Sequence, residues 1–233
     1  MARQPRIDLP GIAQHIVQRG NDRQPCFARA GDYAGYLCEL AEAATKHDCA
    51  IHAYVLMTNH VHLLATPHEP GAISRMMQAI GRRYVACFNA RYRRTGTLWE
   101  GRFKAALVGS TRYALACYRY IELNPVRARM ATSPDGYSWS SHGHNALGLE
   151  QAFITSHAAY RALGDSDQVR REAYRALFDK GLSVEDMDEI RRYTRQQRVY
   201  GSEKLRREVE ALTQRAAVAR PRGRPRADPS LEK

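Results

Sequence analysis

The sequence has too few cysteines, too irregularly placed, for a disulfide-stabilised or zinc-finger protein. Five cysteines occur among 233 residues, at positions 26, 38, 49, 87 and 117. Their number is odd and no two are spaced as C-x-x-C, whereas disulfide frameworks and zinc sites require paired, closely spaced sets. We therefore expect a protein of a reducing compartment, the cytoplasm.

Long apolar runs are also missing. No stretch approaches the roughly 20 consecutive apolar residues that a membrane helix needs. The first residues lack the apolar segment of a signal peptide. We therefore expect no membrane partner.

Acidic residues are scarce relative to basic ones. Lys and Arg number 36 against 24 Asp and Glu, which gives a formal net charge of +12 and a pI near 9.8. The charge could merely keep the chain soluble, but the arginines are clustered, which favours a nucleic-acid partner. We expect DNA as the partner, association with the nucleoid and no small-molecule cofactor.

The pattern of apolar residues predicts alternating strands and helices. The resulting order, strand–helix–strand–strand–helix–strand–helix, begins like the α+β ferredoxin-like arrangement, a four-stranded antiparallel sheet backed by two helices. The other sheet face would then be open to carry a site. Strands are expected at 12–19, 51–57, 60–65 and 103–108, and helices from a cap at Asp32, over 73–88, and from Ser110 or Thr111 to Asn124, where Pro125 disfavours continuation.

We divide the chain into three parts. Residues 1–150 form the site-bearing domain, 151–218 a charged helical extension, and 219–233 a basic tail too rich in Pro, Gly and Arg to fold alone. The tail segment 221–225 (Pro-Arg-Gly-Arg-Pro) is similar to an AT-hook core, whose Arg222 and Arg224 would enter a narrow minor groove. A generic counterion-releasing tail is the alternative.

The most informative motif is His60-Val61-His62. Residues two apart on a strand share a face, so both imidazoles project together and make half of a divalent-metal site. Two structural histidines are the alternative interpretation. A second pair, His142 and His144, follows no strand pattern, and we interpret it as surface loop.

A second element strengthens the metal interpretation. Tyr120 and Asn124 are four apart on the last predicted helix and so share a face. If that helix crosses the open sheet face, they meet His60 and His62. A tyrosine hydroxyl has a free pKa of about 10 and attacks phosphorus only when charge is neutralised, as a divalent ion would do. Tyr113 and Tyr118 are the competing tyrosines.

These motifs, in this order, resemble the HUH single-tyrosine transposases, and among them the REP-associated tyrosine transposases. Segments 98–104 (Leu-Trp-Glu-Gly-Arg-Phe-Lys) and 139–141 (Trp-Ser-Ser) add to a resemblance that covers roughly residues 8–145. It implies the HUH nuclease fold and cleavage and rejoining of hairpin-flanked single-stranded DNA with Mg²⁺ or Mn²⁺. His60 and His62 would be metal ligands and Tyr120 the nucleophile that forms a 5′-phosphotyrosine. Asn124 would be the third ligand, although many relatives have Gln there; it could instead cap the helix or contact DNA.

Other assignments stay open at this point. Arg102, Lys104 and Arg127 could bind DNA phosphates or be solvated, and His15 could approach the site or fill a sheet edge. The enzyme could serve DNA transposition or mobilise dispersed repeats, and it could form a homodimer. The alternatives are a non-catalytic regulator that binds hairpin DNA, and a replication initiator or relaxase of the same HUH class.

Overall fold

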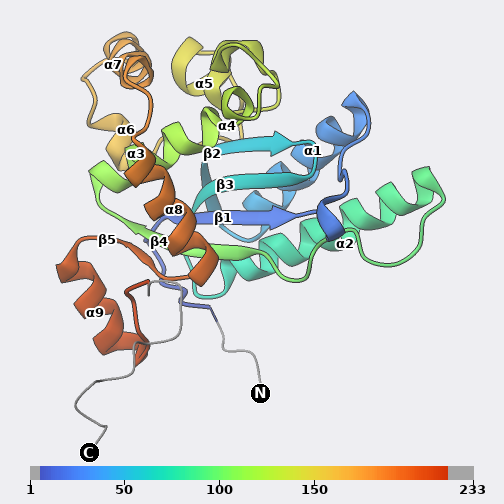
Figure 1. Ribbon diagram of the computed structural model, residues 1–233, viewed down its shortest axis with the longest axis horizontal. Helices are drawn as coiled ribbons and strands as arrows, with labels where there is room; N and C mark the ends of the chain where they lie inside the picture. Colours follow the sequence, from blue (N-terminus) through green and yellow to red (C-terminus); the bar gives the residue numbers. More distant parts are fainter. Residues whose placement is uncertain (1–5, 220–233) are drawn as a thin grey trace, which may run out of the picture.

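The computed structural model describes residues 6–219 and contains one five-stranded sheet, in the order β2-β3-β1-β4-β5 (Figure 1). Strands β1 to β4 pair antiparallel, whereas the short β5 runs parallel to β4. The predicted α+β fold is confirmed, and the C-terminal part of the chain adds the fifth strand. The strands are β1 (Gln14–Arg19), β2 (Cys49–Met57), β3 (His60–Pro67), β4 (Lys104–Gly109) and β5 (Val199–Gly201).

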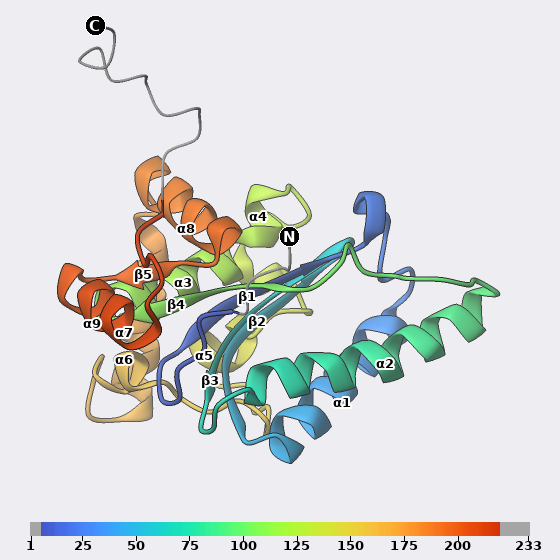
Figure 2. The same cartoon turned by 90° about the horizontal axis from the view of Figure 1, so that it is seen from below.

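One face of the sheet is covered by two long helices. α1 (Ala30–Lys46) and α2 (Ala72–Tyr92) lie side by side on this face (Figure 2). Alternate strand residues, such as Ile16, Val61 and Leu63, point into this core and are fully buried. A register slip of one residue would turn them to the other face, so this packing specifies the register of the sheet.

The opposite face bears the candidate site and is crossed by α3, the arrangement in which Tyr120 was expected to meet the histidines, but its further cover by α8 was not predicted. α3 (Thr111–Glu122) and α8 (Val184–Gln196) pack across it, against β2, β4 and β1. Tyr118 of α3 and Ile190 and Tyr193 of α8 belong to one buried cluster. Burial of these side chains accounts for the cover, so residues beyond position 150 share a core with the residues before it.

The remaining described elements are short or lie at the periphery. They are η1 (Asn21–Arg23), α4 (Asn124–Arg127), η2 (Pro134–Gly136), α5 (His142–Leu147), α6 (Ala158–Arg161), α7 (Asp167–Asp179) and α9 (Glu203–Thr213). No helix among residues 6–219 is both long and apolar enough to span a membrane.

Two predicted helix boundaries differ from the structure. α1 begins at Ala30, two residues before the expected cap, and the carboxylate of Asp32 reaches back to accept hydrogen bonds from the backbone N–H groups of Ala28 and Arg29. α3 ends at Glu122, and Asn124 begins the separate helix α4 with Pro125 in its first turn. Tyr120 and Asn124 therefore lie on consecutive helices, not on one continuous helix.

A buried carboxylate links the end of α3 to α5 and α7 through hydrogen bonds. Glu122 is fully buried and accepts hydrogen bonds from Ser141, His142, Asn145 and Tyr174 at 2.6 to 2.9 Å. Burial alone would lower the pKa of His142, but its hydrogen bond to Glu122 and the charges of Glu122 and the neighbouring aspartate raise it.

The interpretation of His142 and His144 as surface loop was wrong. His142 is buried and both residues belong to α5. The contact with Glu122 holds the His142 ring inside, and Glu122 lies 20 residues away in the sequence. No local pattern around position 142 signals that partner.

Glu122→Ala is expected to destabilise the protein by about 3–5 kcal/mol, because it leaves several buried polar groups without a hydrogen-bond partner. Urea unfolding of the full chain measures the change. The control is Glu203→Ala, which removes an exposed glutamate paired with Arg207 on α9 and should cost less than about 0.5 kcal/mol. Equal stability of the two variants would mean that the Glu122 network contributes nothing net.

Candidate active site

α8 crosses the sheet near α3 (Figure 1). Residues of α8, α3 and the sheet line a basic cavity of about 1050 Å³. Six of its lining residues are Arg or Lys and two are Asp or Glu, so it favours an anionic ligand. It brings together seven of the residues considered in the sequence analysis: His15, His60, His62, Tyr120, Asn124, Arg102 and Lys104. The other lining residues are Val17, Arg19, Glu100, Gly101, Asp188, Arg191, Arg192, Thr194 and Arg195.

One of the predicted DNA-binding residues, Arg127, does not line this cavity, and two others lie in the tail. Arg127 lies against Tyr120 without lining the cavity. Arg222 and Arg224 lie outside the described residues.

The neighbouring residue Asn59 determines which ring nitrogen of His60 carries the proton. The Asn59 side-chain amide donates to the Arg23 carbonyl at 2.9 Å, which leaves its Oδ1 to face His60 Nδ1 at 2.7 Å. An amide oxygen only accepts, so Nδ1 of His60 carries the proton and Nε2 keeps its lone pair. Burial, and then the charge of Arg19, lower the pKa of His60 to about 4, so the ring is neutral at pH 7.

His62 is packed against His15. The two rings stack with centroids 5.1 Å apart, and His15 Nε2 lies 2.9 Å from His62 Nδ1. His15 Nδ1 lies 2.9 Å from the hydroxyl of Thr194 on α8. Burial and neighbouring positive charges lower the pKa of His15 to about 3 and that of His62 well below its usual value. Both rings are therefore neutral at pH 7, the state in which an imidazole binds a metal.

Tyr120 lies in the last turn of α3, and its ring centroid is 5.6 Å from that of His15 and 5.7 Å from that of His62. Its side chain is 7% exposed. The Arg127 guanidinium lies 4.4 Å from the ring centroid and donates to the Tyr120 carbonyl at 2.6 Å. A hydrogen bond with Tyr120 raises the pKa of Arg191. Both cations are placed to stabilise negative charge on the phenolic oxygen.

The competing tyrosines are occupied elsewhere. Tyr113 packs edge-on against Tyr200, with centroids 4.4 Å apart, and Tyr118 is fully buried in the second core. Neither lines the cavity. Of the three tyrosines weighed from the sequence, Tyr120 alone faces the two histidines.

The donor groups fit a divalent cation with an incomplete set of protein ligands. Nε2 of His60 is free to coordinate, His62 lies beside it with ring centroids 5.0 Å apart, and the Asn124 amide lines the same cavity. Two nitrogens and one oxygen leave further positions for water or a phosphate oxygen. Within residues 6–219, no group of three or more His, Cys, Asp and Glu side chains is placed to hold a metal ion, so the candidate protein ligands are these two imidazoles and one amide.

Sequence reasoning missed the contribution of α8. Asp188, Arg191, Thr194 and Arg195 line the cavity, yet they lie some 130 residues beyond the histidines of β3. Their spacing is that of any amphipathic surface helix, so nothing in the local sequence identifies them as site residues. His15 did carry a signal, because it alternates with the core residue Ile16 and so points to the site-facing side of β1.

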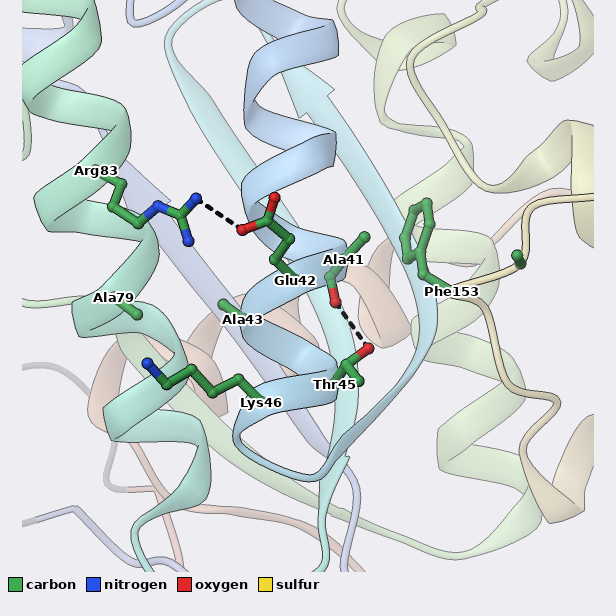
Figure 3. Close-up of a pocket in the computed structure, with 9 residues that line it drawn as sticks. Ala41, Glu42, Ala43, Thr45, Lys46, Ala79, Arg83 and Phe153 are labelled. Atoms are coloured by element: carbon green, nitrogen blue, oxygen red, sulfur yellow. Dashed lines mark hydrogen bonds and ion pairs between the residues drawn. The ribbon is translucent and has the colours of Figure 1, made fainter.

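A second hollow, of about 740 Å³, lies on the other side of the molecule between α1, α2 and Phe153 (Figure 3). Its charged pair, Arg83 and Glu42, is 2.7 Å apart and mutually neutralised, and Thr45 donates to the Ala41 carbonyl. Alanines make up much of the remaining lining. This hollow offers neither a nucleophile with a base nor a cluster of ligands.

The neutral, buried histidines predict how stability changes with pH in the metal-free protein. An unfolded histidine takes up a proton near pH 6.5, whereas folded His15 does so only near pH 3. The unfolded chain therefore binds more protons in this window, and the free energy of unfolding falls as the pH drops below about 6.5. Urea midpoints at pH 7, 6 and 5 should fall less steeply for His15→Gln than for the wild type. Parallel curves would contradict the burial of a neutral ring.

Comparison with known proteins gives the family. The family model described as IS200-like transposase matches residues 9–124. A solved REP-associated tyrosine transposase bound to a REP hairpin has a TM-score of 0.53 and 18% identity, over 68% of this chain and 96% of that chain. A candidate transposase from Deinococcus radiodurans has a TM-score of 0.36 and 22% identity, over 49% and 89%. No match was found among curated protein sequences. The chain belongs to the IS200-like transposase family.

Proposed function

We propose that this transposase-like DNA-binding protein cuts and rejoins single-stranded DNA by metal-assisted attack of Tyr120. The observation that carries the proposal is the meeting of Tyr120 with His60 and His62 in one basic cavity. These residues come from a helix and a strand that are far apart in the sequence. A tyrosine that packs for stability alone needs neither two neutral imidazoles nor six basic side chains around it.

The chemistry is a transfer between two phosphodiesters. The Tyr120 oxygen attacks phosphorus and forms the Tyr–O–P bond, while the bond from phosphorus to the 3′ oxygen breaks. The phenolic proton ends on that leaving oxygen, which becomes a 3′-hydroxyl. The 5′-phosphotyrosine keeps the energy of the phosphodiester, so an incoming 3′-hydroxyl can rejoin the strand without ATP. The guanidinium groups of Arg191 and Arg127 stabilise charge at the phenolic oxygen.

A divalent cation, Mg²⁺ or Mn²⁺, would be held by His60, His62 and Asn124. When bound, it supplies Lewis-acid polarisation of the scissile phosphate. The protein's own contribution is to keep both imidazoles neutral and to fix the free nitrogen of His60 through Asn59. Asn124 is the first residue of α4, which directly follows the end of α3 that bears Tyr120.

The DNA substrate we propose is a single strand next to a hairpin. The solved relative with the same fold is bound to a REP hairpin, which supports this class of substrate. Arg102 and Lys104 are exposed at the rim of the cavity and would contact backbone phosphates. The tail arginines Arg222 and Arg224 would add sequence-independent affinity. Such an enzyme serves DNA transposition or the mobilisation of dispersed repeats.

A hairpin-binding regulator without cleavage is the second candidate. The covering of Tyr120 by α8 favours it, since the hydroxyl is engaged by Arg191 and the side chain is largely buried. A cleavage assay separates the two candidates.

Tyr120→Phe should abolish the covalent protein–DNA adduct and leave hairpin binding within about twofold, because it removes one oxygen and no apolar contact. A labelled single-stranded hairpin substrate, incubated with Mn²⁺ and run on a denaturing gel, measures the adduct. Tyr113→Phe is the matched control on the same helix and should form adduct like the wild type. An adduct on Tyr120→Phe would show that the nucleophile is another residue.

Lys104→Gln should weaken binding of single-stranded DNA and reduce the slope of log affinity against log salt by about 0.7. The reason is the loss of one phosphate contact with its released counterion. Lys46→Gln removes the same charge beside the hollow on the opposite face (Figure 3) and should leave the slope unchanged. Equal slopes for the two variants would place the DNA elsewhere.

A further inference from the structure

A chain of three buried side chains connects the C-terminal helix α8 to His62. His62 Nδ1 lies 2.9 Å from His15 Nε2, and His15 Nδ1 lies 2.9 Å from Thr194 Oγ1. His15 and Thr194 are 179 residues apart in sequence, and all three residues are buried. With little access to water, each contact needs one donor and one acceptor.

Only two arrangements of protons satisfy both contacts with neutral rings. In the first, the Thr194 hydroxyl donates to His15, His15 donates to His62, and the last proton sits on His62 Nε2. In the second, His62 Nδ1 donates to His15 Nε2 and His15 Nδ1 donates to the Thr194 oxygen. Only the second arrangement leaves a lone pair on His62 Nε2.

The neighbouring histidine already has the matching arrangement. Asn59 holds the proton on His60 Nδ1 and leaves Nε2 bare. A site that binds a cation through both histidines needs the same from His62, because a protonated nitrogen cannot coordinate. A threonine oxygen can accept as well as donate, so Thr194 can end the chain in this direction.

We propose that Thr194, acting through His15, is a positioning residue that fixes the proton of His62 on Nδ1 and so completes the cation site. The C-terminal extension is then a working part of the catalytic centre, since α8 supplies the end of the chain. This inference rests on the proposed function, because the need for a cation bound through both histidines selects the second arrangement. The arrangement of protons itself is a property of the metal-free protein.

Mn²⁺ binding by the full-length protein, measured by isothermal titration calorimetry without DNA, tests the consequence. Thr194→Val keeps the shape of the side chain and removes the acceptor, and we expect Mn²⁺ affinity to fall about 10- to 100-fold. Thr194→Ser keeps the hydroxyl and should bind within about threefold of the wild type. Thr213→Val is the control, because that hydroxyl lies on α9 and donates to the Val209 carbonyl. Wild-type affinity in Thr194→Val would overturn the proposal.

Nitrogen-15 NMR of the metal-free protein, labelled at histidine, tests the arrangement directly. The expected result is that His15 and His62 both carry the proton on Nδ1 in the wild type, and that His62 loses this preference in Thr194→Val. A proton on His62 Nε2 in the wild type would overturn the inference. If NMR gives the expected result but Mn²⁺ does not bind, the proposed metal chemistry is wrong and the positioning role of Thr194 is retained.

Discussion

The proposed chemistry depends on the antiparallel pairing of β1 with β3. In that pairing Val17 lies opposite His62 and His15 opposite Leu64, so the two imidazoles are diagonal neighbours on the same face. The other face of the same strands carries Ile16, Val61 and Leu63 into the core beneath α1 and α2. Apolar burial on one face therefore fixes the position of polar groups on the other, and a slip of one residue would lose both.

The second constraint is the way α3 is held against this sheet. Its last turn carries Tyr120 toward the histidines and Glu122 away from them, into the buried network with α5 and α7. Residues two apart on a helix point in different directions, so the network that fixes Glu122 also fixes the direction of Tyr120. The helix breaks at Leu123, and Asn124, the first residue of α4, lines the cavity.

Burial gives these polar groups their properties. The cover of α3 and α8 removes water from His15 and His62, which keeps both rings neutral, and it leaves one opening surrounded by arginines and Lys104. Under the proposed function, a phosphodiester that enters would meet two neutral imidazoles, the Tyr120 hydroxyl and several cations in a partly desolvated space, where electrostatic interactions are stronger than in water.

Local patterns predicted the parts of this account that depend on short-range periodicity. The alternation around His60 and His62 predicts their common face, and the four-residue spacing of Tyr120 and Asn124 predicts that both approach one site. Long-range contacts had no such signal. Thr194 and Arg191 reach the cavity only because α8 docks on β4 and β1, and His142 is buried only because Glu122 has a carboxylate at that point. The residue pattern of the C-terminal extension predicted helices, but it did not predict which surface of the sheet these helices cover.

The most direct test of the central claim is a peptide map of the covalent adduct. Trypsin cleaves after Arg112, Arg119 and Arg127, so Tyr120 lies in the peptide 120–127, whereas Tyr113 and Tyr118 lie together in 113–119. The peptide 120–127 (Tyr-Ile-Glu-Leu-Asn-Pro-Val-Arg) holds no other hydroxyl side chain. After reaction with a single-stranded hairpin and Mn²⁺, mass spectrometry should find the nucleotide on peptide 120–127 and lose it when EDTA replaces the metal. A nucleotide on peptide 113–119, or an adduct that forms equally in EDTA, would contradict the account.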